Sequence, residues 1–357
     1  MIRLFIIILM CIGGLGAVNA RNNKQAAPTE ALAKVRGWSG NPILPGFHAD
    51  PEVLYSEKTG RVYIYSTTDG HPGWGGWYFT CYSSANLTDW RYEGVNLDVR
   101  KQTVWAKGNA WAPCIIEKKN ADGKYKYYFY YSGDAGHAKA IGVAVADEPT
   151  GPFTDFGKPI IDHRPAGQNH GQQIDVDVFQ DPDTDDCYLY WGNGYMAGAK
   201  LNADMTSIDL STETLMTPKG STLKDYAYRE APYVFKRNGL YYFLWSVDDT
   251  GSPNYHVVYG TSRSPLGPIE VAKDPVILIQ DAANQIYGTA HNSVLQIPGK
   301  DKWYIVYHRI NKDFIDRTKG PGWHREVCID KLEFAKDGTI KRTTPTAKGV
   351  KAIKLSH

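Results

Sequence analysis

Three carboxylates stand in similar sequence settings, each shortly before an aromatic segment of the chain. They are Asp50 in PGFHADPEVLY, Asp175 in QQIDVDVF and Glu230 in YREAPYVF. A protonated and an ionised carboxyl group on opposite sides of a pocket can hydrolyse a glycosidic bond without a metal ion or a nucleophilic serine. Each acid could instead cap a turn, so the hydrolytic interpretation depends on a fold that brings the three together.

An aromatic pattern follows these acids and occurs five times along the chain. Turn residues, such as DGK at Asp122–Lys124, come directly before four of the five occurrences. Alternating aromatic and β-branched residues between turns are typical of strands, and their regular recurrence indicates a repeat fold. The segments are VYIY at Val62–Tyr65, YYFYYS at Tyr127–Ser132, CYLYWG at Cys187–Gly192, YYFLWS at Tyr241–Ser246 and WYIVYH at Trp303–His308.

Five such repeats predict an all-β fold, a five-bladed β-propeller whose blades surround a central axis. No linker rich in proline or serine separates the repeats, so residues 38–357 are predicted to form a single catalytic domain. In this fold the segment before each aromatic strand is the innermost strand of its blade. The residues predicted to face one another around the axis are Asp50, Trp111, Asp175, Glu230 and His291.

The overall composition argues against a nucleic-acid-binding protein. The chain has 357 residues, with 40 basic and 38 acidic side chains and a net charge of +2. No long run of one sign provides the concentrated positive charge that nucleic acid requires. The lysine-rich end, Lys348–Lys354, is predicted to be a solvated tail. Aromatic residues make up 13% of the chain, which suits pleated strands and leaves some rings to stack on sugars.

The amino terminus has the layout of a secretory signal peptide. Arg3 precedes an apolar stretch from Leu4 to Leu15, and small residues follow up to Ala20. A membrane anchor is the alternative, but the apolar stretch is short for a span. We predict a signal peptide of residues 1–20, cleaved after Ala20, and a flexible lead-in of residues 21–37. The mature protein would be secreted or periplasmic and not bound to a membrane.

The cysteines of the predicted mature chain are Cys81, Cys114, Cys187 and Cys328. None forms a Cys-x-x-Cys pair, so a zinc site is not expected. Export permits disulfides, yet each cysteine lies in or beside an apolar strand pattern. Buried free thiols are therefore predicted.

The chain resembles glycoside hydrolase family 43, whose members are five-bladed β-propellers. The resemblance rests on motifs in a fixed order: HADP, WAP, ID followed by YLYWG, REAPY followed by NGLYY, HNS followed by WYIVYHR, and REVCID. It extends from Asn41–Pro51 to Asp337–Ile340. Many relatives have EGP and IDP where this chain has EAP at Glu230–Pro232 and IDV at Ile174–Val176. Neither difference changes a carboxylate, but both weaken any transfer of sugar specificity.

The resemblance implies a role for each acid. Asp50 would be the general base, Glu230 the general acid, and Asp175 the carboxylate that orients the acid and raises its pKa. Asp177, two residues after Asp175, would share its strand face and is the closest competitor for that role. Because the family inverts the anomeric centre, the base and the acid should lie about 6.5–9.5 Å apart, which leaves room for a water molecule.

The resemblance also implies residues that bind the sugar. Arg325 would hydrogen-bond sugar hydroxyls or a carboxylate, and Trp111 and Trp74 would form walls of the pocket. His291 matches a histidine that contacts a bound water or a calcium environment in relatives. Its metal contact would be indirect at best, because calcium prefers oxygen ligands. No cofactor would be required, and a structural calcium at the propeller axis is the only metal expected. The remaining aromatic candidates, equally suited to packing, are Trp77, Trp105 and Trp323.

The breadth of the family and the single domain predict an exo-acting α-L-arabinofuranosidase that degrades plant cell-wall polysaccharide or oligosaccharide. The alternatives within the family are a β-D-xylosidase or xylanase and an exo-β-1,3-galactosidase. A propeller that only binds carbohydrate is the non-enzymatic alternative, although such a protein would be expected to lack one of the three acids. The predicted partner is a glycan that contains arabinose or xylose.

Overall fold

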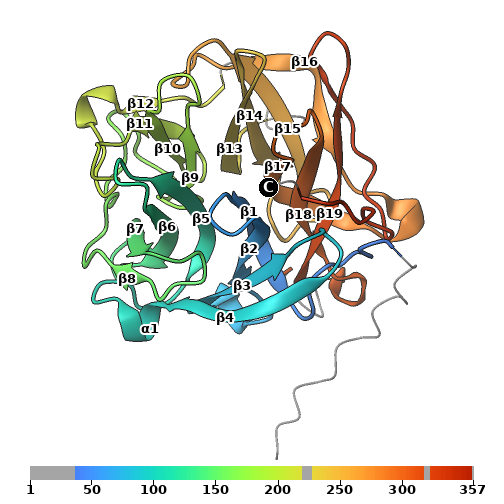
Figure 1. Ribbon diagram of the computed structural model, residues 1–357, viewed down its shortest axis with the longest axis horizontal. Helices are drawn as coiled ribbons and strands as arrows, with labels where there is room; N and C mark the ends of the chain where they lie inside the picture. The colour runs from blue at the N-terminus through green and yellow to red at the C-terminus, as the bar shows by residue number, and fades with distance from the viewer. Residues whose placement is uncertain (1–36, 219–226, 317–321, 356–357) are drawn as a thin grey trace, which may run out of the picture.

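The aromatic repeats form the five blades of a β-propeller, as predicted. The computed structural model describes residues 37–218, 227–316 and 322–355. In this part of the chain, five four-stranded antiparallel sheets surround a central axis, and each sheet runs outward in chain order (Figure 1). The predicted signal peptide, residues 1–20, and all of the predicted lead-in except Gly37 lie outside the described residues. No described helix is long and apolar enough to cross a lipid bilayer.

Each blade begins at the axis and ends at the rim of the disc. The first blade contains β1 (His48–Ser56), β2 (Arg61–Thr68), β3 (Tyr78–Ser84) and β4 (Trp90–Asp98). The second contains β5 (Trp111–Lys119), β6 (Tyr125–Asp134), β7 (Lys139–Ala146) and β8 (Thr154–Asp155). The third contains β9 (Asp177–Gln180), β10 (Cys187–Trp191), β11 (Ala197–Lys200) and β12 (Thr214–Leu215).

The last two blades are built in the same order, and β17 of the fifth blade is the longest of the five inner strands at 10 residues. The fourth contains β13 (Glu230–Arg237), β14 (Leu240–Val247), β15 (His256–Ser262) and β16 (Glu270–Leu278). The fifth contains β17 (Tyr287–Gln296), β18 (Trp303–Ile310), β19 (Arg325–Phe334) and β20 (Ile340–Lys341). Short helical turns connect some strands: α1 (Val99–Gln102), η1 (Pro72–Trp74), η2 (Leu210–Thr212), η3 (Ala282–Asn284) and η4 (Lys312–Phe314).

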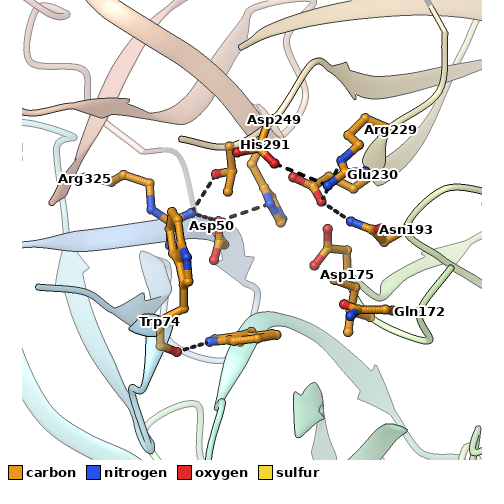
Figure 2. Close-up of a pocket in the computed structure, with 13 residues that line it drawn as sticks. Asp50, Trp74, Gln172, Asp175, Asn193, Arg229, Glu230, Asp249, His291 and Arg325 are labelled. Atoms are coloured by element: carbon orange, nitrogen blue, oxygen red, sulfur yellow. Dashed lines mark hydrogen bonds and ion pairs between the residues drawn. The ribbon is translucent and has the colours of Figure 1, made fainter. Parts of the chain in front are cut away.

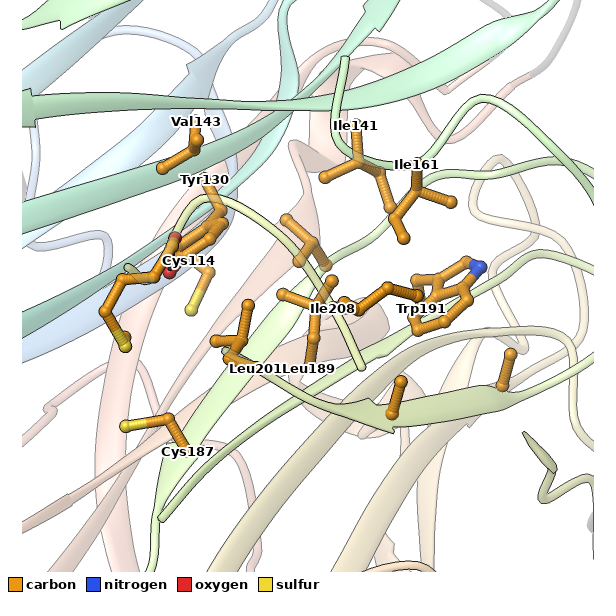
Figure 3. Packing of buried hydrophobic residues seen from close by; sticks show 14 of the residues in the cluster. Cys114, Tyr130, Ile141, Val143, Ile161, Cys187, Leu189, Trp191, Leu201 and Ile208 are labelled. Atoms are coloured by element: carbon orange, nitrogen blue, oxygen red, sulfur yellow. Dashed lines mark hydrogen bonds between the residues drawn. The ribbon is translucent and has the colours of Figure 1, made fainter. Parts of the chain in front are cut away.

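The five aromatic segments are the second strands of the blades, and they pack the blades together. Successive residues of a strand point to opposite faces, so each second strand contributes to two interfaces. Tyr190 packs against Phe243 of the fourth blade, whereas Trp191 belongs to the cluster that contains Ile141 of the second blade (Figure 3). The hydrophobic core therefore consists of clusters that lie between adjacent blades. The four cysteines are buried free thiols within these clusters, as predicted.

The two ends of the described chain close the disc. The backbone N–H of Ser39 donates to the Val350 carbonyl at 2.8 Å, and that of Ile43 donates to the Val327 carbonyl in β19 at 2.8 Å. Val350 and Leu355 are buried. The prediction of a solvated tail at Lys348–Lys354 is therefore wrong for its backbone. This segment is hydrogen-bonded to the start of the propeller, and Val350 is buried there.

Candidate active site

A cavity of about 180 Å³ opens at the centre of the disc. Figure 2 shows Asp50 on one side of this cavity, Asp175 and Glu230 on the other, and His291 between them. The fold thus brings together acids that are far apart in the sequence. The predicted site residues that line the cavity are Asp50, Trp74, Trp111, Asp175, Glu230, His291 and Arg325.

The inner segments bend where they reach the cavity. The pairing register with the second strand shifts between Ala49 and Glu52 in β1 and at the matching points of β5, β13 and β17. One non-glycine residue in each blade adopts a positive φ there, which is rare and costs on the order of 1–3 kcal/mol. These residues are Asp50 (50°), Ala112 (44°), Asp175 (59°), Ala231 (59°) and His291 (46°). Strain that recurs in every blade is retained because the surrounding contacts enforce it.

The positions of these bends show which residues of the five inner segments are equivalent, and they differ from the prediction in two blades. Ala112 and Ala231, rather than Trp111 and Glu230, occupy the position equivalent to Asp50. The prediction that Trp111 and Glu230 share this position is therefore wrong by one residue. Glu230 enters the cavity from the residue before the bend, so its side chain approaches from a different direction. A proline follows the bend in three blades and gives the correct alignment from sequence: Pro51, Pro113 and Pro232.

Hydrogen bonds between neighbouring blades hold four of the bends in place. In each case the backbone N–H of the bend residue donates to a side chain on the second strand of the preceding blade. Every bend is therefore fixed by the blade beside it rather than by its own sheet. The pairs are Asp50 with His308 Nδ1 (3.2 Å), Ala112 with Thr67 Oγ1 (2.8 Å), Asp175 with Ser132 Oγ (3.0 Å) and His291 with Ser246 Oγ (3.0 Å).

The remaining bend, at Ala231 in the fourth blade, is held by a carboxyl group of the cavity instead of a side chain on the second strand. The corresponding position of the third blade is Gly192, where an added Cβ would lie 2.1 Å from the Tyr195 carbonyl oxygen. A side-chain acceptor therefore cannot be placed there. The Ala231 N–H donates instead to Asp175 Oδ2 at 3.2 Å. The Asp175 carboxyl group thereby fixes the backbone directly after Glu230.

Asp50 is a buried carboxylate surrounded by donors. Arg325 Nη1 donates to its Oδ1 at 2.9 Å, His291 Nδ1 lies 3.1 Å from the same oxygen, and Thr67 Oγ1 donates to Oδ2 at 2.8 Å. Burial alone would raise the pKa of Asp50, but Arg325 and His291 outweigh it and hold this pKa well below its usual value. Asp50 is therefore ionised at neutral and mildly acidic pH.

Arg325 is oriented so that one of its nitrogens reaches Asp50. Its Nε donates to Asp69 Oδ2 at 2.8 Å, and its Nη2 donates to Asp69 Oδ1 at 3.2 Å. The guanidinium group also lies over the Trp74 ring, 4.9 Å from the ring centre. Because arginine stays protonated in proteins, Arg325 places a permanent positive charge beside Asp50.

Glu230 has weaker compensation for its burial. The Tyr255 hydroxyl donates to its Oε1 at 2.8 Å, and the Asn193 amide donates to its Oε2. Arg229 Nε lies 3.9 Å from the Glu230 carboxylate. Burial raises the pKa of Glu230, and Arg229 and Tyr255 oppose this rise only in part. Glu230 is therefore protonated to a higher pH than an exposed glutamate.

Asp175 is the second acid on this side of the cavity. Burial raises the pKa of Asp175 to about 8, an effect that His291 opposes and the negative charge of Glu230 reinforces. Interacting carboxyl groups titrate as a pair, so Asp175 and Glu230 share protons that Asp50 on the opposite side does not carry. Acid–base hydrolysis across a pocket requires this contrast in protonation.

The comparison with known families agrees with this geometry. Residues 39–340 match Glycosyl hydrolases family 43. The chain belongs to this family. As a family 43 enzyme it is a glycosidase that inverts the anomeric centre, and its chemistry needs no metal ion.

Three relatives of the family 43 enzyme illustrate the range of its neighbours. The β-D-galactofuranosidase xynD of Aspergillus niger is 31% identical, over 89% of this chain and 88% of that protein. An arabinoxylan arabinofuranohydrolase of Paenibacillus polymyxa is 28% identical over 98% of this chain, which spans only 58% of that protein. A β-xylosidase/α-arabinofuranosidase from a compost metagenome, solved with xylotriose in a calcium-free form, is 25% identical with a TM-score of 0.70, over 86% of this chain and 98% of its own.

The aromatic candidates divide into two groups in the family 43 pocket. Trp111 and Trp74 form one wall, where Trp111 Nε1 donates to the Trp74 carbonyl at 2.8 Å. The other three tryptophans do not line the cavity. They pack elsewhere: Trp77 under Arg100, Trp105 against Tyr131 and Trp323 edge-on to Trp74.

The sequence reasoning missed several polar residues of the site. Thr67 and Asp69 follow the first aromatic segment, and Asn193 follows the third. A polar residue just after an aromatic segment is therefore the signal that could have identified them. Four polar residues that line the cavity were missed in addition to Asn193: Gln172, Arg229, Asp249 and Thr250.

Asp177 does not line the cavity. It accepts a hydrogen bond from the Val234 N–H at 2.8 Å and forms a buried cluster with Glu52 and Cys114, whose ligand-type atoms all lie within 4.8 Å of one another. Burial raises the pKa of all three groups, that of Asp177 to about 7. Calcium takes about six to eight oxygen ligands, so a thiol with two carboxyl groups of raised pKa does not fit the predicted calcium.

Proposed function

We propose that this family 43 enzyme is an exo-acting α-L-arabinofuranosidase that acts on plant cell-wall polysaccharide or oligosaccharide. The observation that carries the proposal is the placement of ionised Asp50 across one small cavity from Glu230 and Asp175, two interacting carboxyl groups whose pKa values are raised. At about 180 Å³ the cavity is smaller than the clefts of about 300–1,000 Å³ that enclose larger ligands. This size favours the release of one terminal sugar.

In the proposed mechanism Glu230 is the general acid and Asp50 the general base. Glu230 donates its proton to the glycosidic oxygen as the bond from that oxygen to the anomeric carbon breaks. Asp50 removes a proton from a water molecule, whose oxygen bonds to the anomeric carbon from the opposite face. The separation of about 6.5–9.5 Å that this geometry needs stays a prediction.

Asp175 acts as a positioning residue in this proposal. Its carboxyl group accepts the Ala231 N–H at 3.2 Å and so orients the backbone that carries Glu230. Its negative charge, once formed, disfavours the ionised form of Glu230 and keeps the acid protonated. On the other side, Arg325 holds Asp50, while His291, Trp111 and Trp74 provide surfaces for the sugar ring.

The second candidate for the released sugar is β-D-galactofuranose. The relative with 31% identity is named a β-D-galactofuranosidase, so a furanoside with a longer exocyclic group is the second candidate. β-D-Xylosidase or xylanase activity follows in view of the xylotriose-bound relative. The exo-β-1,3-galactosidase and the propeller that only binds carbohydrate complete the set of alternatives.

The glycone should be identified by hydrolysis of four aryl glycosides: α-L-arabinofuranoside, β-D-galactofuranoside, β-D-xylopyranoside and β-D-galactopyranoside. We expect the arabinofuranoside to have the highest kcat/KM and its first product, followed by proton NMR, to have the inverted configuration. Activity should persist in EDTA, because no step uses a metal. A higher kcat/KM for another glycone would replace the arabinofuranosidase assignment, and binding of oligosaccharide without any hydrolysis would support the non-enzymatic alternative.

The pH profile of kcat/KM should have a basic limb that reports the acid pair. As pH rises, Glu230 loses the proton that it must donate, so activity should fall through the range in which the pair titrates, with Asp175 at about 8. The acidic side should stay flat, because the pKa of Asp50 lies well below its usual value. Asp175→Asn removes the neighbouring negative charge and should move the basic limb to lower pH. An unmoved limb would contradict the role of Asp175.

Two further predictions rest on the sequence. We propose that residues 1–20 direct export and are removed, which sequencing of the mature amino terminus would test by showing Arg21 as the first residue. A structural calcium at the propeller axis stays a prediction, and the cluster of Glu52, Cys114 and Asp177 does not fit it. A rise in Tm on addition of calcium to the chelated enzyme would support it.

A further inference from the structure

A second hollow, of about 540 Å³, adjoins the catalytic cavity. The two share Gln172, Asn193 and Arg229 as lining residues. Asn193 also donates to the Glu230 carboxylate, so the hollow meets the catalytic cavity at the proposed acid. In Figure 2 the side chains of Asn193, Arg229 and Gln172 lie on the side of the cavity away from Asp50.

The position of this hollow indicates which part of the substrate it receives. An acid that protonates the leaving oxygen stands beside the part of the substrate that leaves. The released sugar fills the cavity between Asp50 and Glu230, so the leaving part extends past Glu230 and Asn193. The hollow is larger than the catalytic cavity, about 540 against 180 Å³, and can hold more than the linkage itself. This step rests on the proposed function.

Every described ionisable side chain that lines the hollow is basic. These basic side chains come from three segments: the β6–β7 hairpin, the segment before β9 and the residue before β13. The whole chain has 40 basic and 38 acidic groups, so its composition does not explain this concentration. A cleft lined by charges of one sign attracts ligands of the opposite sign. The basic lining residues are His137, Lys139, Arg164, His170 and Arg229.

Carboxylates outside the hollow compensate two of these charges. Lys139 Nζ lies 3.3 Å from Asp134 Oδ2, and Arg229 Nη2 lies 3.3 Å from Asp249 Oδ2. Lys139 Nζ also lies 5.0 Å from the centre of the Trp111 ring, which links this basic side to the wall of the catalytic cavity. These two residues therefore keep a fixed place at the junction of the cavity and the hollow.

Arg164 is oriented but not neutralised. Its Nε and Nη2 both donate to the Gly171 carbonyl oxygen at 3.2 Å, which fixes the plane of the guanidinium group. No ion pair of Arg164 with a carboxylate is found among the described residues. A solvated basic surface is the ordinary explanation for exposed arginines. A guanidinium group held by a neutral backbone oxygen, in a hollow next to the acid, instead suits a planar anionic group that can accept two hydrogen bonds.

We propose that this hollow binds an anionic group on the leaving part of the substrate, either the carboxylate of a uronosyl unit or a sulfate ester. Arg164 makes the direct contact, and Lys139 and Arg229 add positive charge at the entrance from the catalytic cavity. The enzyme would then remove neutral terminal sugars from an acidic glycan. The charge acts on recognition of the leaving part and not on the bond-breaking step.

The proposal is tested first with a matched pair of substrates. One is an oligosaccharide that carries the cleaved sugar next to a uronosyl unit, and the other is the same oligosaccharide after reduction of its carboxyl group to a neutral alcohol. We expect kcat/KM at low salt to be about tenfold higher for the acidic substrate, and this ratio to fall towards one at about 1 M salt, where charges are screened over about 3 Å. A ratio near one at low salt for the carboxylate, and for a sulfated analogue, would overturn the proposal.

Variants then locate the effect. Arg164→Gln should reduce the ratio of the two kcat/KM values towards one, and Arg164→Lys should retain part of it, because the charge remains and the planar fork is lost. Arg263→Gln removes the same charge from an exposed turn after β15 and should leave the ratio unchanged. An equal loss of the ratio in Arg263→Gln would overturn the assignment to the hollow. The melting temperature of each variant shows that folding is retained.

A binding measurement separates this proposal from the proposed function. Calorimetric titration of the wild-type enzyme with D-galacturonate, D-glucose 6-sulfate and neutral methyl glucoside requires no hydrolysis. Binding of either anion, weakened by Arg164→Gln, supports the anionic hollow even if all four aryl glycosides prove inert. Hydrolysis of an aryl glycoside with no binding of either anion supports the proposed function and overturns the anionic hollow.

Discussion

Replacement of Glu230 by glutamine is expected to lower kcat/KM about 10²–10⁴-fold, the range that a positioned general acid contributes. The loss should be largest for natural glycosides, whose leaving oxygen needs a proton, and smaller for an aryl glycoside with a highly acidic phenol. Glutamine keeps an oxygen that can accept the Tyr255 hydroxyl, and the Asn193 amide can turn to present its own oxygen to the new NH₂ group. The variant should therefore fold as the wild type does.

The comparison of leaving groups makes this prediction specific. A merely structural role for Glu230 would lower the activity on all substrates by the same factor. Asp330→Asn is a suitable control, because Asp330 is also a buried carboxylate but lies in β19, where it accepts hydrogen bonds from Tyr307 and Thr346. The control is expected to lose stability and to keep its kcat/KM. Equal losses for good and poor leaving groups in Glu230→Gln would contradict its assignment as the acid.

The sequence predicts the propeller because the second strand of each blade carries a recognisable aromatic pattern. Those strands bury aromatic residues on both faces, so Trp191 and Trp245 are fully enclosed, and the pattern is strong enough to count blades. The inner strands are less visible, since a bend interrupts their alternation close to the axis. The pairing of the Val350 segment with Ser39 also left no local signal, because it joins residues at opposite ends of the domain.

The acids of the site were predictable, but their arrangement was not. Motifs located Asp50, Asp175 and Glu230, and the structure places all three in one cavity. The one-residue offset of Glu230 was missed because its acidic side chain was aligned instead of the proline that follows the bend. The contact from Ala231 to Asp175 depends on Gly192, a position without a side chain, so no pattern of residue types could reveal it.

The bends give three residues of this site two purposes each. Asp50, Asp175 and His291 supply both a functional side chain and a strained backbone position. Each backbone N–H is tied to the neighbouring blade, so the distance across the cavity is set by the packing between blades. A change in the second strand of one blade, such as Ser132→Ala, thus acts on an acid of the next blade.

Replacement of Asp50 by asparagine is expected to lower kcat/KM by at least about 10³-fold, because the ionised carboxylate that lines the cavity beside Arg325 is lost as a base. The shape of the side chain is kept. Its oxygen can still accept Arg325 Nη1, and its NH₂ group can donate to Thr67 Oγ1, which already accepts the Ala112 N–H and has a second lone pair. Arg325 also retains Asp69 as a partner, so the stability should fall only modestly.

The loss in Asp50→Asn should be the same for good and poor leaving groups, in contrast to Glu230→Gln, because activation of water does not depend on the leaving oxygen. Parallel measurement of both variants on the same two substrates therefore distinguishes a base from an acid. An added small nucleophilic anion should restore part of the activity of Asp50→Asn, since such an anion needs no deprotonation. Unchanged kcat/KM in a folded Asp50→Asn would show that another group activates the water, and His291, 3.1 Å from Asp50, would be examined next.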